Sequence, residues 1–136
     1  MTGTIRVVRC CCSVEFMDDG KARALGVSNF DQSQLLALAE TATHNPSLLQ
    51  SKLSIVHHDD PTIQYCRKNG IVYQSYSPLC GGYNGSSCSR GGGSNVMTVP
   101  AVREIAKARG KSAAQIGLRW IVQQGLPLTT AVWDLE

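Results

Sequence analysis

The chain has 136 residues, of which 43% are hydrophobic and 17% charged, a composition typical of one globular domain. No apolar run approaches the roughly 18 residues of a membrane-spanning helix, which argues against membrane insertion. The 13 basic and 10 acidic residues are scattered, for a net charge of +3, and form no basic stripe that would bind nucleic acid. Because the N-terminus lacks the apolar segment of a secretory signal, the expected location is cytoplasmic.

Strand and helix patterns alternate from residue 23 onward. Residues 23–27 are predicted as a strand. A helix is predicted over 32–41, with Asp31 as its N-cap and with Phe30 and Leu35 in the positions of a hydrophobic staple. This first unit therefore reads as strand, turn and helix.

A second strand is predicted over residues 47–54, and residues 71–76 are predicted as the third. Between them a short helix is expected over 61–69, because Asp60 suits the N-cap and Pro61 the first helical position.

Residues 80–95 are almost all Gly, Ser, Cys and Asn, a composition that predicts a mobile loop. Two helices are then expected, over 100–110 and 112–125, the second beginning at a Ser-x-x-Gln capping box. Residues 128–132 are predicted as the fourth strand. The alternation implies an α/β fold with four parallel strands, and the pattern fits either a doubly wound open sheet or half of a (β/α)8 TIM barrel.

Several kinds of chemistry are excluded by missing motifs. The chain has no Walker P-loop, no G-x-G-x-x-G fingerprint between a strand and a helix, and no G-x-S-x-G elbow. Residues 57–60 (HHDD) are the densest cluster of metal-ligand types, but neighbours on an extended chain point to opposite faces, so no metal site is predicted. The six cysteines show no C-x-x-C spacing and are interpreted as reduced thiols.

Polar residues stand at the C-terminal ends of two predicted strands. Ser28 and Asn29 end the first strand, and Tyr76 and Ser77 end the third. Barrels and open α/β sheets bind their ligands at this edge. A Ser-Asn pair at the end of a strand is also common in turns that bind no ligand.

Three segments resemble the aldo-keto reductases: GKARALGVSNF (20–30), GIVYQSYSPLCGG (70–82) and PAVREIAKARGKSAAQIGLRWIVQQG (100–125). The similarity runs over about residues 15–132 and implies that the four strands are the fifth to eighth of a (β/α)8 barrel. Residues 1–14 match nothing in the family and are expected to be an unrelated N-terminal tail, with 15–136 forming the C-terminal half of the oxidoreductase domain.

The resemblance implies a parent activity, the NADPH-dependent reduction of aldehydes or ketones. Ser28 and Asn29 would hydrogen-bond the nicotinamide carboxamide with help from Gln50, and Tyr76 would stack on the nicotinamide ring. Ser77 and Leu79 would contact the pyrophosphate. The choice of NADP(H) over NAD rests on the family alone, because the Pro-Lys-Ser/Thr run expected after the last strand is replaced by Thr-Ala-Val.

The family's catalytic Asp, Tyr, Lys and His come from the first half of the barrel, so no catalytic residue is assigned and the chain alone is expected to be inactive. Near Gln50 the family's preceding Asn and following His-Pro are also replaced, by Leu49 and by Ser54-Ile55. The alternative function is a non-catalytic half-barrel module that binds the cofactor or associates with itself through exposed strand edges.

Overall fold

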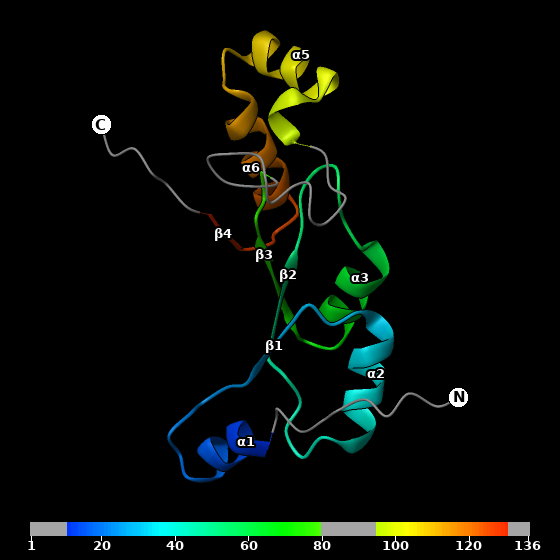
Figure 1. Cartoon of the computed structure of the whole chain (residues 1–136), viewed down its shortest axis with the longest axis vertical. Helices are drawn as coiled ribbons and strands as arrows, with labels where there is room; N and C mark the ends of the chain where they lie inside the picture. The colour runs from blue at the N-terminus through cyan, green and yellow to red at the C-terminus, as the bar shows by residue number, and fades with distance from the viewer. Residues whose placement is uncertain (1–10, 80–94, 131–136) are drawn as a thin grey trace.

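A four-stranded parallel sheet forms the centre of the structure. The computed structural model describes residues 11–79 and 95–130, and of residues 11–13 the backbone alone. The strands pair in chain order (Figure 1): β1 (Gly26–Ser28), β2 (Leu48–Lys52), β3 (Val72–Tyr76) and β4 (Leu128–Thr129). Because at least one helix lies between each strand and the next, the predicted parallel α/β fold is confirmed.

Helices connect the strands and precede the first of them. They are α1 (Cys11–Asp18), α2 (Gln32–Thr41), α3 (Asp60–Lys68), α5 (Pro100–Arg109) and α6 (Ala113–Gln123), with a 3-10 helix, η2 (Val96–Thr98). The sequence predicts all of these except α1 and η2. α1 has no acidic first turn and no basic last turn that would mark its ends. Residues 1–10 and 80–94, which carry most of the predicted tail and loop, lie outside the described residues.

The helix caps agree with the sequence at two helices and differ at a third. Asp31 and Ser112 are the N-caps that the sequence predicts, and both form capping boxes, although the sequence predicts such a box only at Ser112. The N-cap of α3 is Asp59 and not Asp60, since Asp59 Oδ1 accepts the Thr62 N–H at 3.2 Å. Asp60 is instead the first helical residue, and its carboxylate lies 3.0 Å from His58 Nδ1.

The strands are shorter than the sequence predicts. β1 begins at Gly26, three residues after the predicted start, because its pairing partner β2 begins only at Leu48. β4 is paired only over Leu128 and Thr129, while 131–132 of the predicted strand lie outside the described residues.

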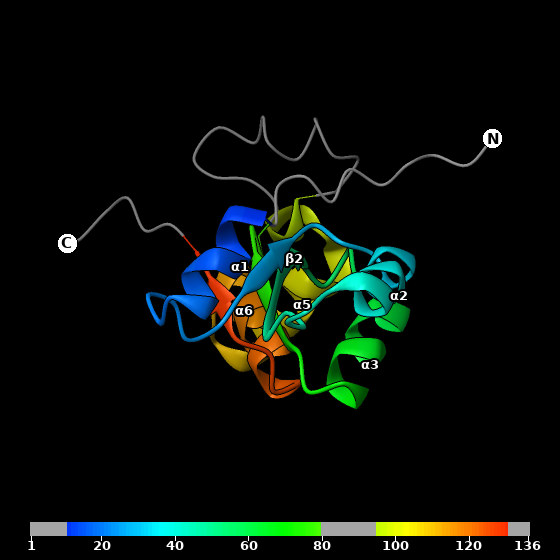
Figure 2. The same cartoon turned by 90° about the horizontal axis from the view of Figure 1, so that it is seen from below.

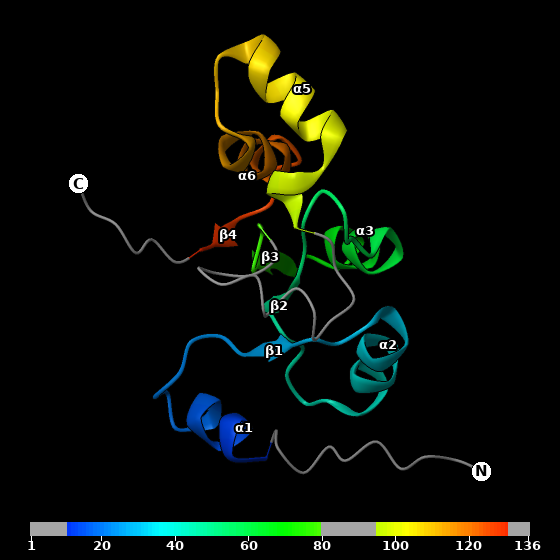
Figure 3. The same ribbon diagram turned by 45° about the horizontal axis from the view of Figure 1, so that its top comes forward.

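The hydrophobic core lies between one face of the sheet and the helices α2, α3 and α6. Figures 2 and 3 show α2 and α3 together beside the strands, with α6 near the end of the row at β4. The core residues come from β2, β3, the three helices and the segments that follow β2 and α6: Leu35, Leu49, Leu53, Ile63, Cys66, Tyr73, Ile121 and Leu126. Burial of these side chains is the main stabilising contribution to the sheet.

The opposite face of the sheet is not covered by any described helix or strand. On β3 the side chains alternate, with Tyr73 3% exposed and its neighbour Val72 48% exposed. Val72 pairs in register with Leu48, and Gln74 with Gln50, so these four residues share the open face. The open face is therefore apolar at the start of the strands and polar toward their ends.

Helix α6 packs tightly on η2 through Gly117. A Cβ atom on Gly117 would lie 2.8 Å from Val96 Cγ1 and 3.2 Å from Leu79 Cδ2, closer than side-chain carbons normally approach. Because Val96 has no exposed surface, it has little freedom to move away. Glycine therefore sets the distance between α6 and the chain that follows β3.

We expect Gly117→Ala to destabilise the chain by about 1–3 kcal/mol through overpacking, although alanine favours a helix interior by about 1 kcal/mol. Urea unfolding of Gly117→Ala, Val96→Ala and the double variant measures this. The double variant should lose less stability than the sum of the two single losses, because alanine at position 96 leaves room for the new methyl group at position 117. Additive effects would contradict the contact.

The buried thiol of Cys66 makes stability depend on pH. Burial raises the pKa of Cys66, and the Asp59 carboxylate raises it further. As pH rises above about 8.5, the usual thiol pKa, the unfolded chain loses this proton before the folded chain does, so the free energy of unfolding falls. Cys66→Ala lacks the part of this decrease that comes from the thiol. Urea unfolding at pH 7 and about pH 9.5 should therefore show a smaller fall in the free energy of unfolding for Cys66→Ala than for the unchanged protein. Equal losses in the two proteins would rule out this linkage.

Candidate functional site

The end of β1 is tied to β2 through the backbone of Asn29. Asn29 has a φ of 58°, the left-handed region that asparagine adopts more readily than most residues. This turn directs the Asn29 N–H to the carbonyl oxygen of Gln50, at 2.9 Å. The chain then reaches the Asp31 cap of α2, where hydrogen bonds from the Ser33 hydroxyl and the Gln34 amide lower the pKa of the Asp31 carboxyl.

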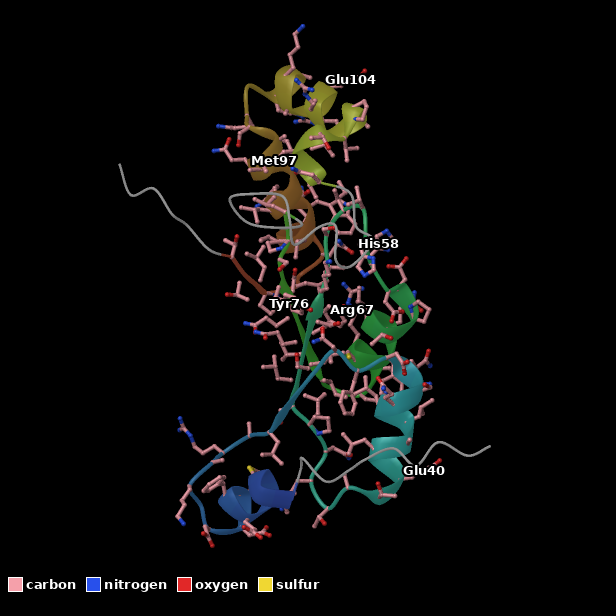
Figure 4. All side chains as sticks on the ribbon, viewed as in Figure 1. Glu40, His58, Arg67, Tyr76, Met97 and Glu104 are labelled. Carbon is pink, nitrogen blue, oxygen red and sulfur yellow. The ribbon has the colours of Figure 1, made fainter. Side chains whose placement is uncertain are left out.

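The end of β3 reaches across to the same turn. The hydroxyl of Tyr76 donates to Asn29 Oδ1 at 2.9 Å, although the two residues are 47 positions apart. Asn29 Nδ2 donates in turn to Ser28 Oγ at 3.1 Å. In Figure 4 Tyr76 lies near the middle of the molecule, over the strands. The structure therefore joins three of the predicted site residues in one hydrogen-bonded chain.

Gln50 lies beside this chain on the open face. It pairs in register with Ser28 on one side and with Gln74 on the other. Its Nε2 donates to Gln74 Oε1 at 2.8 Å, and both side chains are partly buried. Gln50 is thus held at the strand ends by its backbone bond to Asn29 and by its side-chain bond to Gln74.

Ser77 and Leu79 continue from β3 toward the helices. Ser77 has a φ of 50°, so the chain turns sharply after Tyr76. The Leu79 side chain points toward α6, where its Cδ2 lies close to Gly117. Leu79 is therefore a packing residue through its side chain, and the predicted pyrophosphate contact of Ser77 and Leu79 stays a prediction.

Sequence reasoning missed two residues of the open face, Gln74 and Lys52. Gln74 bonds to Gln50, and Lys52 pairs in register with Tyr76. The period of two along a strand could have indicated both, since Gln74 is two residues before Tyr76 and Lys52 two after Gln50. Gln74 lies in segment 70–82, but the resemblance gave it no role, and Lys52 lies in none of the three segments that carry the resemblance.

Three other titratable side chains, those of Tyr73, His44 and His58, have their contacts with residues outside this rim. Tyr73 faces the helices, where burial raises the pKa of its hydroxyl. His44 bonds to Asp18, and His58 to Asp60 while its ring lies 5.6 Å from that of Trp120. Within residues 11–79 and 95–130, no three His, Cys, Asp or Glu side chains are grouped so as to hold a metal ion. No helix in this part of the chain is long and apolar enough to cross a membrane.

Comparison with known proteins finds relatives whose similarity extends over most of this chain. The chain is 36% identical over 117 residues to NAD(P)H-dependent 6'-deoxychalcone synthase of Glycine max, covering 86% of the chain and 35% of that protein. It is 38% identical over 115 residues to deoxymugineic acid synthase 1-B of Triticum aestivum, covering 85% and 35%. It spans about a third of the length of these relatives.

Among solved structures, the aldose reductase of Schistosoma japonicum superimposes with a TM-score of 0.69 and 26% identity, over 86% of this chain and 34% of that one. Four parallel strands alternating with helices thus match part of a (β/α)8 barrel enzyme. The profile of the Aldo/keto reductase family matches residues 11–132. The chain therefore belongs to the aldo/keto reductase family.

Proposed function

We propose that this chain supplies the nicotinamide-binding part of an NADP(H)-dependent reductase of aldehydes or ketones. Its strands would be the fifth to eighth of the barrel, and the protein would act in the cytoplasm. The observation that carries the proposal is the hydrogen-bonded chain from Tyr76 through Asn29 to Ser28, with Gln50 beside it. These residues meet at the carboxyl ends of parallel strands, the edge at which barrel enzymes bind their ligands.

The residues of this rim fit a nicotinamide in both shape and chemistry. The ring needs a flat apolar surface, and the half-buried Tyr76 offers an aromatic face on the open side of the sheet. The carboxamide needs neutral donors and acceptors, which Ser28, Asn29 and Gln50 offer. The bond from the Tyr76 hydroxyl to Asn29 limits rotation of both side chains, so the site is partly ordered before a ligand binds.

In this proposal each residue binds or orients, and none takes part in proton transfer. Tyr76 selects which face of the ring is turned to the substrate, while Ser28, Asn29 and Gln50 fix its rotation. The cofactor, when bound, supplies the hydride. The small carbonyl substrate and the proton donor belong to the rest of the barrel, so this chain alone is expected to bind cofactor without turnover. The comparison with NAD(P)H-dependent 6'-deoxychalcone synthase supports a nicotinamide cofactor.

Calorimetric titration with NADPH tests the proposal. Saturable binding is expected, and Tyr76→Ala should weaken it about tenfold because the stacking surface is lost. Phe16→Ala is the matched control, since Phe16 is an aromatic residue of α1 that is 50% exposed and distant in sequence from the strand ends. A flat titration of the unchanged protein, or equal effects of the two substitutions, would refute the assignment.

A second candidate function, self-association, is favoured by the open face and the two edge strands. β1 and β4 each pair on one side only among the described strands, and unpaired backbone groups at a sheet edge bind other strands. Val72, 48% exposed, adds apolar surface beside Leu48. In this proposal a second copy covers the open face.

If copies associate through this face, Val72→Lys should shift the protein toward monomer, because a charged side chain is costly to bury. Val122→Lys is the matched control, since Val122 is 50% exposed on α6, away from the open face. Sedimentation at tens of micromolar distinguishes the species. A monodisperse monomer before any substitution would exclude self-association under those conditions.

A further inference from the structure

Gln74 lies in the middle of the candidate site, although none of the recognised motifs assigns it a role. It is in register with Gln50, which is in register with Ser28, so the three residues form one row across β1, β2 and β3. It is also two residues before Tyr76 on the same strand, and both are half-buried on the open face. Gln74 is therefore the direct neighbour of Gln50 across the strands and is next to Tyr76 on the same face of β3.

The hydrogen bond between the two glutamines leaves one free group on each. Gln50 Nε2 donates to Gln74 Oε1 at 2.8 Å. Within the part of the chain that the structure describes, Gln50 Oε1 and Gln74 Nε2 make no hydrogen bond to protein. The pair thus offers a ligand the Gln50 Oε1 acceptor and the Gln74 Nε2 donor, together with the second N–H of Gln50 Nε2.

This arrangement is complementary to a primary carboxamide. Such a group has an N–H₂ donor and a carbonyl acceptor a short distance apart, and it can bond to the acceptor and the donor of the pair at once. A carboxylate would place a second acceptor against Gln50 Oε1, and an acetyl group would place a methyl there. Unmatched polar groups of this kind reduce affinity, which makes the pair selective for the amide.

We propose that Gln74 is a positioning and specificity residue of the nicotinamide site: it fixes the side chain of Gln50 and, with it, selects a primary carboxamide on the bound ring. This rests on the proposed cofactor function and adds to it the group that is recognised. The hydrogen bond at 2.8 Å and the shared register are the observations that carry it.

The experiment compares two ligands by calorimetry, NADP⁺ and its 3-acetylpyridine analogue, in which the amide nitrogen is replaced by methyl. The unchanged protein should prefer NADP⁺ by about 3- to 10-fold, the value of one or two lost hydrogen bonds. Gln74→Met keeps the approximate length of the side chain, but its thioether sulfur is only a weak hydrogen-bond acceptor. It should bind NADP⁺ more weakly and lose most of the preference, because Gln50 is then free to rotate.

Gln74→Glu distinguishes the positioning of the Gln50 side chain from a general effect of the substitution on the fold. Its carboxylate still accepts from Gln50 Nε2, so the preference for NADP⁺ over the analogue should be kept even if both ligands bind more weakly. Gln64→Met, an identical change at an exposed position of α3, is the control and should alter neither affinity. A merely structural role of Gln74 would change both affinities together and leave their ratio constant.

The outcomes distinguish this inference from the function on which it rests. If the unchanged protein binds neither ligand, the proposed function fails and the inference fails with it. If it binds NADP⁺ but Gln74→Met keeps the preference, or Gln74→Glu loses it, the role of Gln74 is overturned while the cofactor site stands. Loss of the preference in Gln74→Met alone supports the inference.

Discussion

The pairing of β2 with both of its neighbours fixes the geometry on which the candidate site depends. Side chains alternate between the two faces of a strand, so a slip of one residue would turn Gln50 toward the helices and Leu49 away from them. Leu49 has no exposed surface, and burying such a side chain stabilises a fold by about 2 kcal/mol. The hydrophobic core thus determines, through the register of β2, which polar side chains reach the open face.

Much of the fold could be predicted because its signals are local. The N-cap at Asp31 and the capping box at Ser112 each depend on residues within one turn, and both occur where the sequence predicts them. The cap of α3 was misplaced because Asp59 and Asp60 are chemically equivalent neighbours. The choice between them follows from the path of the incoming chain, which brings Asp59 to the Thr62 N–H and leaves Asp60 beside His58.

The candidate site could be predicted only in part, because some of its contacts depend on residues that are far apart in the sequence. Ser28, Asn29 and Tyr76 stand at strand ends, and parallel strands bring their ends to one edge, so their proximity follows from topology. The pairing of Gln50 with Gln74 depends on the register of two strands 24 residues apart. The sequence pattern does not fix that register. It leaves open where β2 ends near Lys52, and it does not give the path of the chain through α3 to β3.

The rim is built largely from neutral groups, and this agrees with its place on a sheet face. A barrel interior excludes most water, and burying an unpaired charge there costs far more than burying an amide that has a partner. Tyr76, Asn29 and Ser28 bond to one another, and Gln50 bonds to Gln74, so each enters such an environment with at least one hydrogen bond made. The remaining donors and acceptors suit a neutral amide group, while Lys52, in register with Tyr76, brings one cation to the same face at the end of β2. The hydrogen bonds that pair these neutral side chains at the ends of β1, β2 and β3 therefore also fix which donors and acceptors the rim offers to a ligand.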